Sequence, residues 1–97
     1  MKIQWTGKAS SDLVRLYEYL RPIAPDAAAR VIQQLAHAPV RLLDYPRIGE
    51  KLEAYRPREV RRIIVGNYAL RYEITNATIV ILRLWHCREN RSVESDQ

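Results

Sequence analysis

The stretch that decides the fold reads Val60-Arg61-Arg62-Ile63-Ile64-Val65, then Gly66-Asn67, then Tyr68-Ala69-Leu70-Arg71-Tyr72-Glu73-Ile74. Two runs rich in β-branched and aromatic residues flank a two-residue step, a pattern typical of a β-hairpin. Gly accepts a positive φ without a Cβ clash, and Asn tolerates the left-handed region. The sequence therefore predicts an antiparallel hairpin over residues 60–74.

The second run of this hairpin alternates apolar and polar residues, which assigns one of its faces to the core. Its core-facing positions are Tyr68, Leu70, Tyr72 and Ile74. Across a two-residue turn Ile63 opposes Leu70, and this register places Arg62 beside Arg71 on the opposite face. We therefore expect helices on the first face and arginines on the second.

A third apolar run, residues 78–86, follows and closes the sheet. If the loop before it has an odd length, the core positions of the run are Val80, Leu82 and Leu84. An even loop would instead turn Arg83 inward, where an unpaired guanidinium is costly to bury. We expect the odd loop, and therefore a row formed by Arg62, Arg71 and Arg83 with Trp85 as an aromatic neighbour.

The first half of the chain has helical periodicity. After a short strand at residues 2–5, Ser10 or Ser11 can cap a helix whose apolar positions follow the i, i+3, i+4, i+7 pattern. A second helix begins near Pro25, and Pro39 predicts a kink or a restart near its end. The predicted fold class is α+β, with an N-terminal strand and a helical hairpin packed on one face of a small, mainly antiparallel sheet.

The composition is that of a single globular domain over residues 1–97, with residues 92–97 as a flexible tail. The net charge is +5, and thirteen of the sixteen basic residues are Arg. A lone cysteine, a polar N-terminus and no apolar run of roughly 18 residues predict a cytoplasmic protein that does not enter membranes. The basic charge favours an acidic partner, either nucleic acid or protein.

The arginine row can hold phosphates and stack a base, or it can hold an acidic peptide. An ordinary solvated surface of paired arginines stays open beside both hypotheses. His86 is the natural candidate for a general acid or base because its usual pKa lies near neutrality, although a lone His is more often not catalytic. His37 is expected to be structural or exposed. Two His and one Cys without paired spacing predict no metal, and no motif indicates a cofactor.

Taken together, the residues resemble the RelE/ParE superfamily of bacterial toxins from type II toxin-antitoxin modules. The resemblance covers residues 1 to about 91 and rests on the order of the elements and on short motifs: Pro46-x-x-Gly49, Val60-Arg61-Arg62-Ile63, Gly66-Asn67-Tyr68, Tyr72-Glu73-Ile74 and Ile81-x-x-x-Trp85-His86-x-Arg88-x-x-Arg91. It implies a toxin neutralised by a cognate ParD-like antitoxin. We expect the antitoxin to carry a disordered, acidic C-terminal segment that folds on the toxin and contacts Arg62, Arg71 and Arg83.

The superfamily has two branches with different targets. ParE-like members inhibit DNA gyrase, whereas RelE-like members cleave messenger RNA on the ribosome. The residue after Tyr68 is Ala69, where RelE-like ribonucleases carry a catalytic Arg, and the tail lacks their Tyr. These departures favour the ParE-like branch, with a target-binding surface at Trp85, His86, Arg88 and Arg91.

Two alternatives stay open. In a RelE-like ribonuclease the catalytic set would be Arg62, Arg71, Arg83, His86 and Arg88. The second alternative is a non-toxic, basic nucleic-acid-binding module. The sequence leaves open a homodimer or a higher hetero-oligomer with the antitoxin.

Overall fold

The computed structural model describes residues 1–89. Its elements are β1 (Lys2–Trp5), α1 (Gly7–Leu20), α2 (Pro25–His37), α3 (Val40–Asp44), β2 (Glu50–Lys51), the 3-10 turn η1 (Glu53–Tyr55), β3 (Glu59–Val65), β4 (Tyr68–Thr75) and β5 (Thr78–His86). The strands form one sheet in the order β1-β5-β4-β3-β2, in which β1 and β5 are parallel and the other neighbours are antiparallel. The α+β prediction is confirmed.

The β3–β4 hairpin has the predicted register. Val65 pairs with Tyr68, and Arg62 pairs with Arg71. Gly66 has a φ of 61°, which a residue with a side chain rarely adopts. A two-residue turn with this conformation fixes which side chains face each other over the whole length of the hairpin.

The β4–β5 connection differs from the prediction. Its loop has two residues, Asn76 and Ala77, both with positive φ, so the expected odd length is wrong. A β-bulge opposite Arg71 and Tyr72 then shifts the register by one residue and pairs Arg71 with Arg83. The bulge has the same effect on the register as an odd loop, but only from Arg83 to the end of β5.

The even loop and the bulge together change which residues of β5 enter the core. Ile79, Ile81 and Leu84 are fully buried there, whereas the predicted Val80 and Leu82 are only partly buried. Of the three predicted core positions on this strand, only Leu84 is confirmed. Its neighbour in the sheet is Leu70, as the register beyond the bulge requires.

The helices begin and end for local reasons. Thr6 caps α1, because its hydroxyl accepts a hydrogen bond from the Ala9 amide at 3.1 Å, so the predicted cap at Ser10 or Ser11 is wrong. Pro25 occupies the first turn of α2 as predicted. The chain restarts after Pro39 as the short helix α3, which confirms the predicted interruption.

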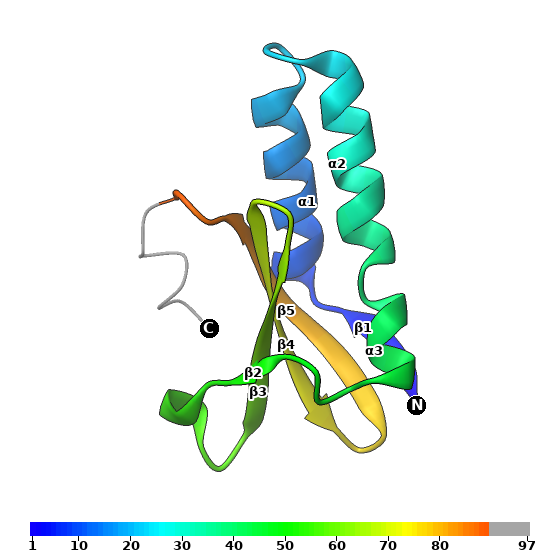
Figure 1. Ribbon diagram of the computed structural model, residues 1–97, viewed down its shortest axis with the longest axis vertical. Helices are drawn as coiled ribbons and strands as arrows, with labels where there is room; N and C mark the ends of the chain where they lie inside the picture. Colours follow the sequence, from blue (N-terminus) through cyan, green and yellow to red (C-terminus); the bar gives the residue numbers. More distant parts are fainter. Residues whose placement is uncertain (90–97) are drawn as a thin grey trace.

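The two long helices cover one face of the sheet and extend beyond it (Figure 1). Leu16 of α1, Leu35 of α2 and Leu42 of α3 pack against the core face of β4 and β5. Within residues 1–89 no helix is long and apolar enough to cross a lipid bilayer.

The loop before β2 is attached to the sheet by Tyr72. The buried hydroxyl of this residue donates to the Pro46 carbonyl at 2.7 Å and accepts from the Gly49 amide at 3.1 Å. A Cβ at Gly49 would lie 2.7 Å from that hydroxyl and 2.9 Å from the Arg62 carbonyl oxygen, so only glycine fits. Burial raises the pKa of Tyr72, which keeps its phenol protonated as a donor.

Candidate functional site

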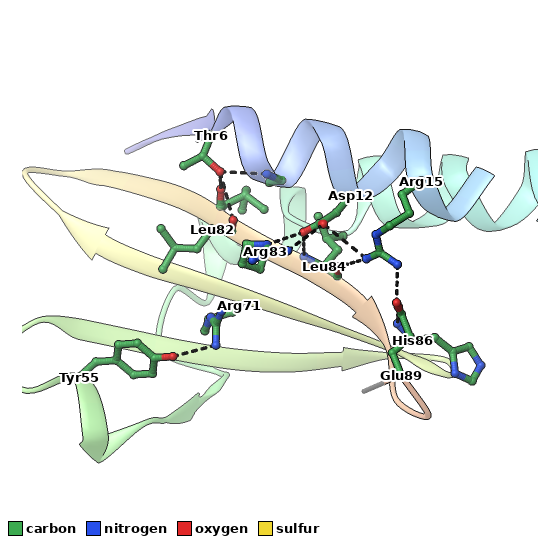
Figure 2. A network of polar contacts seen from close by, with 12 residues as sticks. Thr6, Asp12, Arg15, Tyr55, Arg71, Leu82, Arg83, Leu84, His86 and Glu89 are labelled. Atoms are coloured by element: carbon green, nitrogen blue, oxygen red, sulfur yellow. Dashed lines mark hydrogen bonds and ion pairs between the residues drawn. The ribbon is translucent and has the colours of Figure 1, made fainter. Parts of the chain in front are cut away.

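Thr6, which caps α1, and side chains of α1 itself occupy the outer edge of β5 from the point where β1 ends. The Thr6 hydroxyl lies 2.8 Å from the Ile81 carbonyl oxygen, the Asp12 carboxylate accepts from the Leu84 amide at 2.9 Å, and Arg15 donates to the Leu84 carbonyl at 3.2 Å (Figure 2). These contacts satisfy backbone groups that an exposed edge would present to another strand. The α1 helix therefore takes the place of a neighbouring strand along this part of the sheet.

The same helix binds Arg83 in a buried ion pair. Arg83 donates to the two carboxylate oxygens of Asp12 at 2.8 and 3.2 Å, and the two residues are 9% and 3% exposed. A charged pair at this depth is tolerated because both members are hydrogen-bonded. The guanidinium of Arg83 is thus engaged with α1 and does not lie on an open face of the sheet.

Arg71 is enclosed on the far face of the sheet, away from the helices. Its guanidinium carbon lies 5.4 Å from the centre of the Tyr55 ring and 5.3 Å from that of the Trp85 ring. It also donates to the Tyr55 hydroxyl at 2.8 Å (Figure 2). Arg71 is fully buried and Trp85 is 5% exposed, so this cluster forms a small second core with cation–π character.

The predicted surface of three exposed arginines is therefore wrong, although the three residues do share a cross-strand row. Arg71 and Arg83 are buried. Arg62 is half-buried and bonds to the exposed carboxylate of Glu50 at 2.6 Å. Pairing with acidic and aromatic side chains, which register arguments cannot include, removed two arginines from the surface.

The end of β5 forms a compact turn with many backbone contacts. The Cys87 amide donates to the Asn67 carbonyl at 2.9 Å, which attaches the turn to the β3–β4 hairpin. The Glu89 amide donates to the His86 carbonyl at 2.9 Å, and the Glu89 carboxylate accepts from the His86 amide at 2.6 Å. The same carboxylate pairs with Arg15 of α1 (Figure 2). Residues 86–89 are thus bound to both the sheet and the helix.

A groove of about 560 Å³ separates this turn from α1. Its lining residues are Arg15, Leu16, Tyr19, Leu20, Tyr68, His86, Arg88 and Glu89. The Tyr68 and His86 rings meet edge to face with centroids 5.0 Å apart. Burial raises the pKa of the Tyr68 phenol, and the Glu89 carboxylate acts in the same direction, so the phenol stays protonated at neutral pH. The lining thus combines leucine and tyrosine side chains with the charged residues Arg15, Arg88 and Glu89.

The hydrogen bonding of His86 limits its chemistry. Its Nδ1 accepts from the Arg88 amide at 3.0 Å, so the neutral imidazole carries its proton on Nε2. In this arrangement the outward-facing nitrogen is a hydrogen-bond donor and has no free lone pair with which to accept a proton. The geometry therefore suits binding better than general-base catalysis.

The structure brings together some of the predicted site residues and separates others. His86 and Arg88 line the same groove, whereas Trp85 points to the far face beneath Arg71. Arg91 lies outside the described residues, as does the predicted tail at 92–97. Within residues 1–89 no group of three His, Cys, Asp or Glu side chains is arranged to hold a metal ion.

Sequence reasoning missed the contribution of α1 to this region. Asp12 lies four residues before Leu16, on the buried stripe of the helix, and a lone acid on such a stripe is a signal of a buried partner. Arg15 follows it at i+3, the spacing of a helical ion pair. Tyr19, 69% exposed beside the groove, carries no comparable signal in the sequence.

Comparisons with known proteins agree with this architecture. Residues 3–91 match the family model described as the ParE toxin of type II toxin-antitoxin systems, parDE. The toxin RelE2 of Caulobacter vibrioides is 31% identical over 85 residues, which span 88% of this chain and 93% of the relative. A solved structure of the chromosomal ParDE toxin-antitoxin system from P. aeruginosa superimposes with a TM-score of 0.75 at 22% identity, covering 89% of this chain and 95% of that one. The chain therefore belongs to the ParE family of the RelE/ParE superfamily, the toxins of type II toxin-antitoxin systems that pair with an antitoxin.

Proposed function

We propose that the protein is a ParE-type toxin that inhibits DNA gyrase in the cytoplasm and is neutralised by a cognate antitoxin. The observation that carries this proposal is the match of residues 3–91 to the ParE toxin model. The proposed target surface is the end of β5 with the residues that follow it, namely His86, Arg88 and Arg91. Trp85, predicted for the same surface, is buried beneath Arg71 and would act only by supporting the end of β5. Within this surface, Arg88 is exposed at the rim of the groove, where a cation can meet an acidic partner.

The chemistry around the groove supports binding over RNA cleavage. Ala69 stands after Tyr68 and is 2% exposed, so this position supplies no cation to a phosphate. Arg71 and Arg83 are held by Tyr55 and Asp12, and neither guanidinium lies on an open surface. A ribonuclease needs a base within reach of the ribose hydroxyl, and His86 presents a donor there. The same burial weakens the hypothesis of a non-toxic nucleic-acid-binding module, which depended on the exposed arginine row.

One observation favours the second candidate, a ribosome-dependent ribonuclease. The relative with 31% identity is named RelE2, and His86 and Arg88 lie together in one groove. In that function Arg88 would bind phosphate. His86 would act only after its bond to the Arg88 amide had opened.

We propose that the antitoxin contacts Arg62, the accessible residue of the predicted arginine row. Arg62 lines two shallow hollows, of about 240 and 270 Å³, together with Ile64, which is 59% exposed. An acidic side chain of the antitoxin can compete there with Glu50, while an apolar one covers Ile64. Arg71 and Arg83, predicted for the same role, would act only indirectly by supporting β4 and β5.

Purified toxin in two parallel assays distinguishes the candidates. One assay follows supercoiling and DNA cleavage by gyrase, and the other follows messenger RNA cleavage on programmed ribosomes. We expect inhibited supercoiling with linearised DNA and intact messenger. Messenger cleavage with normal supercoiling would overturn the gyrase proposal.

Two variants further distinguish gyrase inhibition from RNA cleavage. Arg88→Ala is expected to weaken gyrase inhibition about ten-fold or more, the effect of removing an anchoring Arg from an interface. His86→Gln keeps a side-chain acceptor for the Arg88 amide and is therefore expected to weaken gyrase inhibition less than Arg88→Ala does. If the protein is a ribonuclease, His86→Gln should instead lower cleavage by roughly 10²–10⁴.

A further inference from the structure

The turn at residues 86–89 has one attachment to the helical hairpin that involves side chains alone. One oxygen of the Glu89 carboxylate accepts a hydrogen bond from the His86 amide at 2.6 Å, and the other oxygen pairs with Arg15. Arg15 also donates to the Leu84 carbonyl at 3.2 Å and lies 3.4 Å from Asp12. Through Arg15, Glu89 thus links the turn to the Asp12–Arg83 ion pair (Figure 2).

We propose that Arg15 and Glu89 form a positioning pair, which fixes the turn so that Arg88 projects in one direction from the rim of the groove. Neither residue needs to touch the target. The inference rests on the proposed target surface, because the pair acts through Arg88. Its consequence is that toxicity depends on a helix residue 73 positions away from Arg88 in the sequence.

The geometry explains why this pair controls the turn. Arg88 is exposed, and its own backbone amide is bound to His86 Nδ1, a side-chain atom of the same turn. Without Glu89, the His86 amide loses its acceptor and the turn keeps its attachment through Cys87 to Asn67. A partner must then order the turn when it binds, and this ordering reduces affinity.

Because Arg15 and Glu89 are partly exposed, their effect on the position of the turn can be measured separately from the stability of the fold. The side chains of Arg15 and Glu89 are 40% and 25% exposed, and ion pairs at such sites contribute little to the free energy of unfolding. Replacing either residue should therefore leave the fold intact. A matched control exists in Arg58 and Glu73, whose side chains are 41% and 18% exposed and which lie 2.9 Å apart on another part of the sheet.

The chain carries its own reporter for the first test. Cys87 is the single cysteine of the sequence, is exposed and lies inside the turn, so a nitroxide attached to it reports backbone mobility by electron paramagnetic resonance. We expect Glu89→Ala to increase the mobility of the label, Glu89→Gln to increase it less, and Glu73→Ala to leave it unchanged. Gln keeps an acceptor for the His86 amide but lacks the charge that holds Arg15. An immobile label in Glu89→Ala would overturn the proposal.

The second test measures the functional consequence with unlabelled protein. Toxin dose is titrated for growth arrest in cells without antitoxin and for inhibition of purified gyrase. Arg15→Ala and Glu89→Ala are each expected to lose about three- to ten-fold in potency, the effect of leaving one or two side chains to be ordered on binding. The double variant should lose no more than either single variant, because the two residues act as a unit. Arg15→Lys should recover part of the loss, and Glu73→Ala should match the parent.

The outcomes separate this inference from the proposed function. A parent chain that arrests growth without inhibiting gyrase would refute the gyrase proposal and leave the pair to be judged by growth arrest. A mobile turn with undiminished potency in both assays would overturn the positioning role. A parent chain that affects neither growth nor gyrase would overturn both.

Discussion

Asp12 is expected to be the most sensitive polar residue of the fold, and Asp12→Ala tests this. The carboxylate accepts hydrogen bonds from Arg83 at 2.8 and 3.2 Å and from the Leu84 amide at 2.9 Å. Its removal leaves a guanidinium that is 9% exposed without its counter-charge, and leaves a buried backbone amide without an acceptor.

The magnitude follows from the burial of the pair. Breaking a buried ion pair by removing one partner costs about 3–5 kcal/mol, which includes the unsatisfied groups left behind. In a domain of this size each 1 kcal/mol lowers Tm by about 4–8 °C, so the variant should unfold at least ~12 °C below the parent. The exposed pair of Arg58 and Glu73 provides the contrast, since Glu73→Ala should cost no more than about 1 kcal/mol.

Urea unfolding, followed by circular dichroism and by tryptophan fluorescence, measures these free energies. The double variant Asp12→Ala/Arg83→Met should be more stable than Asp12→Ala alone, because it removes the unpaired charge and keeps only the cost of the unsatisfied Leu84 amide, about 1–3 kcal/mol. Asp12→Asn should fall between the parent and Asp12→Ala. A cost below about 1 kcal/mol for Asp12→Ala, or a double variant no more stable than the single one, would refute the reasoning.

Three further predictions concern stability, each measured by urea unfolding. Tyr72→Phe removes the hydroxyl that binds the loop at residues 46–49 and should cost about 1–3 kcal/mol, so a neutral result would show that the loop satisfies its own backbone. Ala77→Gly should stabilise the protein by up to about 1 kcal/mol, because Ala77 has a φ of 56°; a loss of stability would contradict the strain argument. Arg47 lowers the pKa of Glu59, so the Glu59 carboxylate stabilises the fold above its unfolded pKa of about 4.3 and loses this effect as the pH falls through the lower folded value. The stability difference between the parent and Glu59→Gln should therefore be larger at pH 7 than at acidic pH, and a difference that grows on acidification would refute the assignment.

The sequence could predict those parts of the sheet in which local chemistry fixes geometry. Gly66 and Asn67 specify a two-residue turn, and a two-residue turn fixes the pairing of β3 with β4. Asn76 and Ala77 carry a weaker signal, because Ala rarely adopts a positive φ. The bulge that shifts the register of β5 by one residue depends on tertiary contacts, and no local pattern in the sequence predicts it.

The candidate site shows the same division. Placing His86 and Arg88 together at one end of the sheet needed only their positions at the end of the last strand and directly after it. The burial of Arg71 required knowing that the η1 turn brings Tyr55 over the far face of the sheet, a contact between residues 16 positions apart in the sequence. The prediction assumed that arginine side chains lie on the surface. This assumption is wrong where an aromatic or acidic side chain from a distant element binds the guanidinium and allows it to be buried.

The parallel pairing of β1 with β5 has a consequence for how the protein is made. Lys2 pairs with Thr78 and Trp5 with Ile81, so β1 has no partner in the sheet until β5 has been synthesised. At about 5–20 residues per second, the ribosome adds β5 several seconds after β1. Contacts between positions so far apart in the sequence also form slowly, because the chain between them must first be ordered. A nascent or truncated chain that ends before Thr78 therefore lacks β5 and the turn that follows it, so the proposed target surface forms only after β5 has been translated.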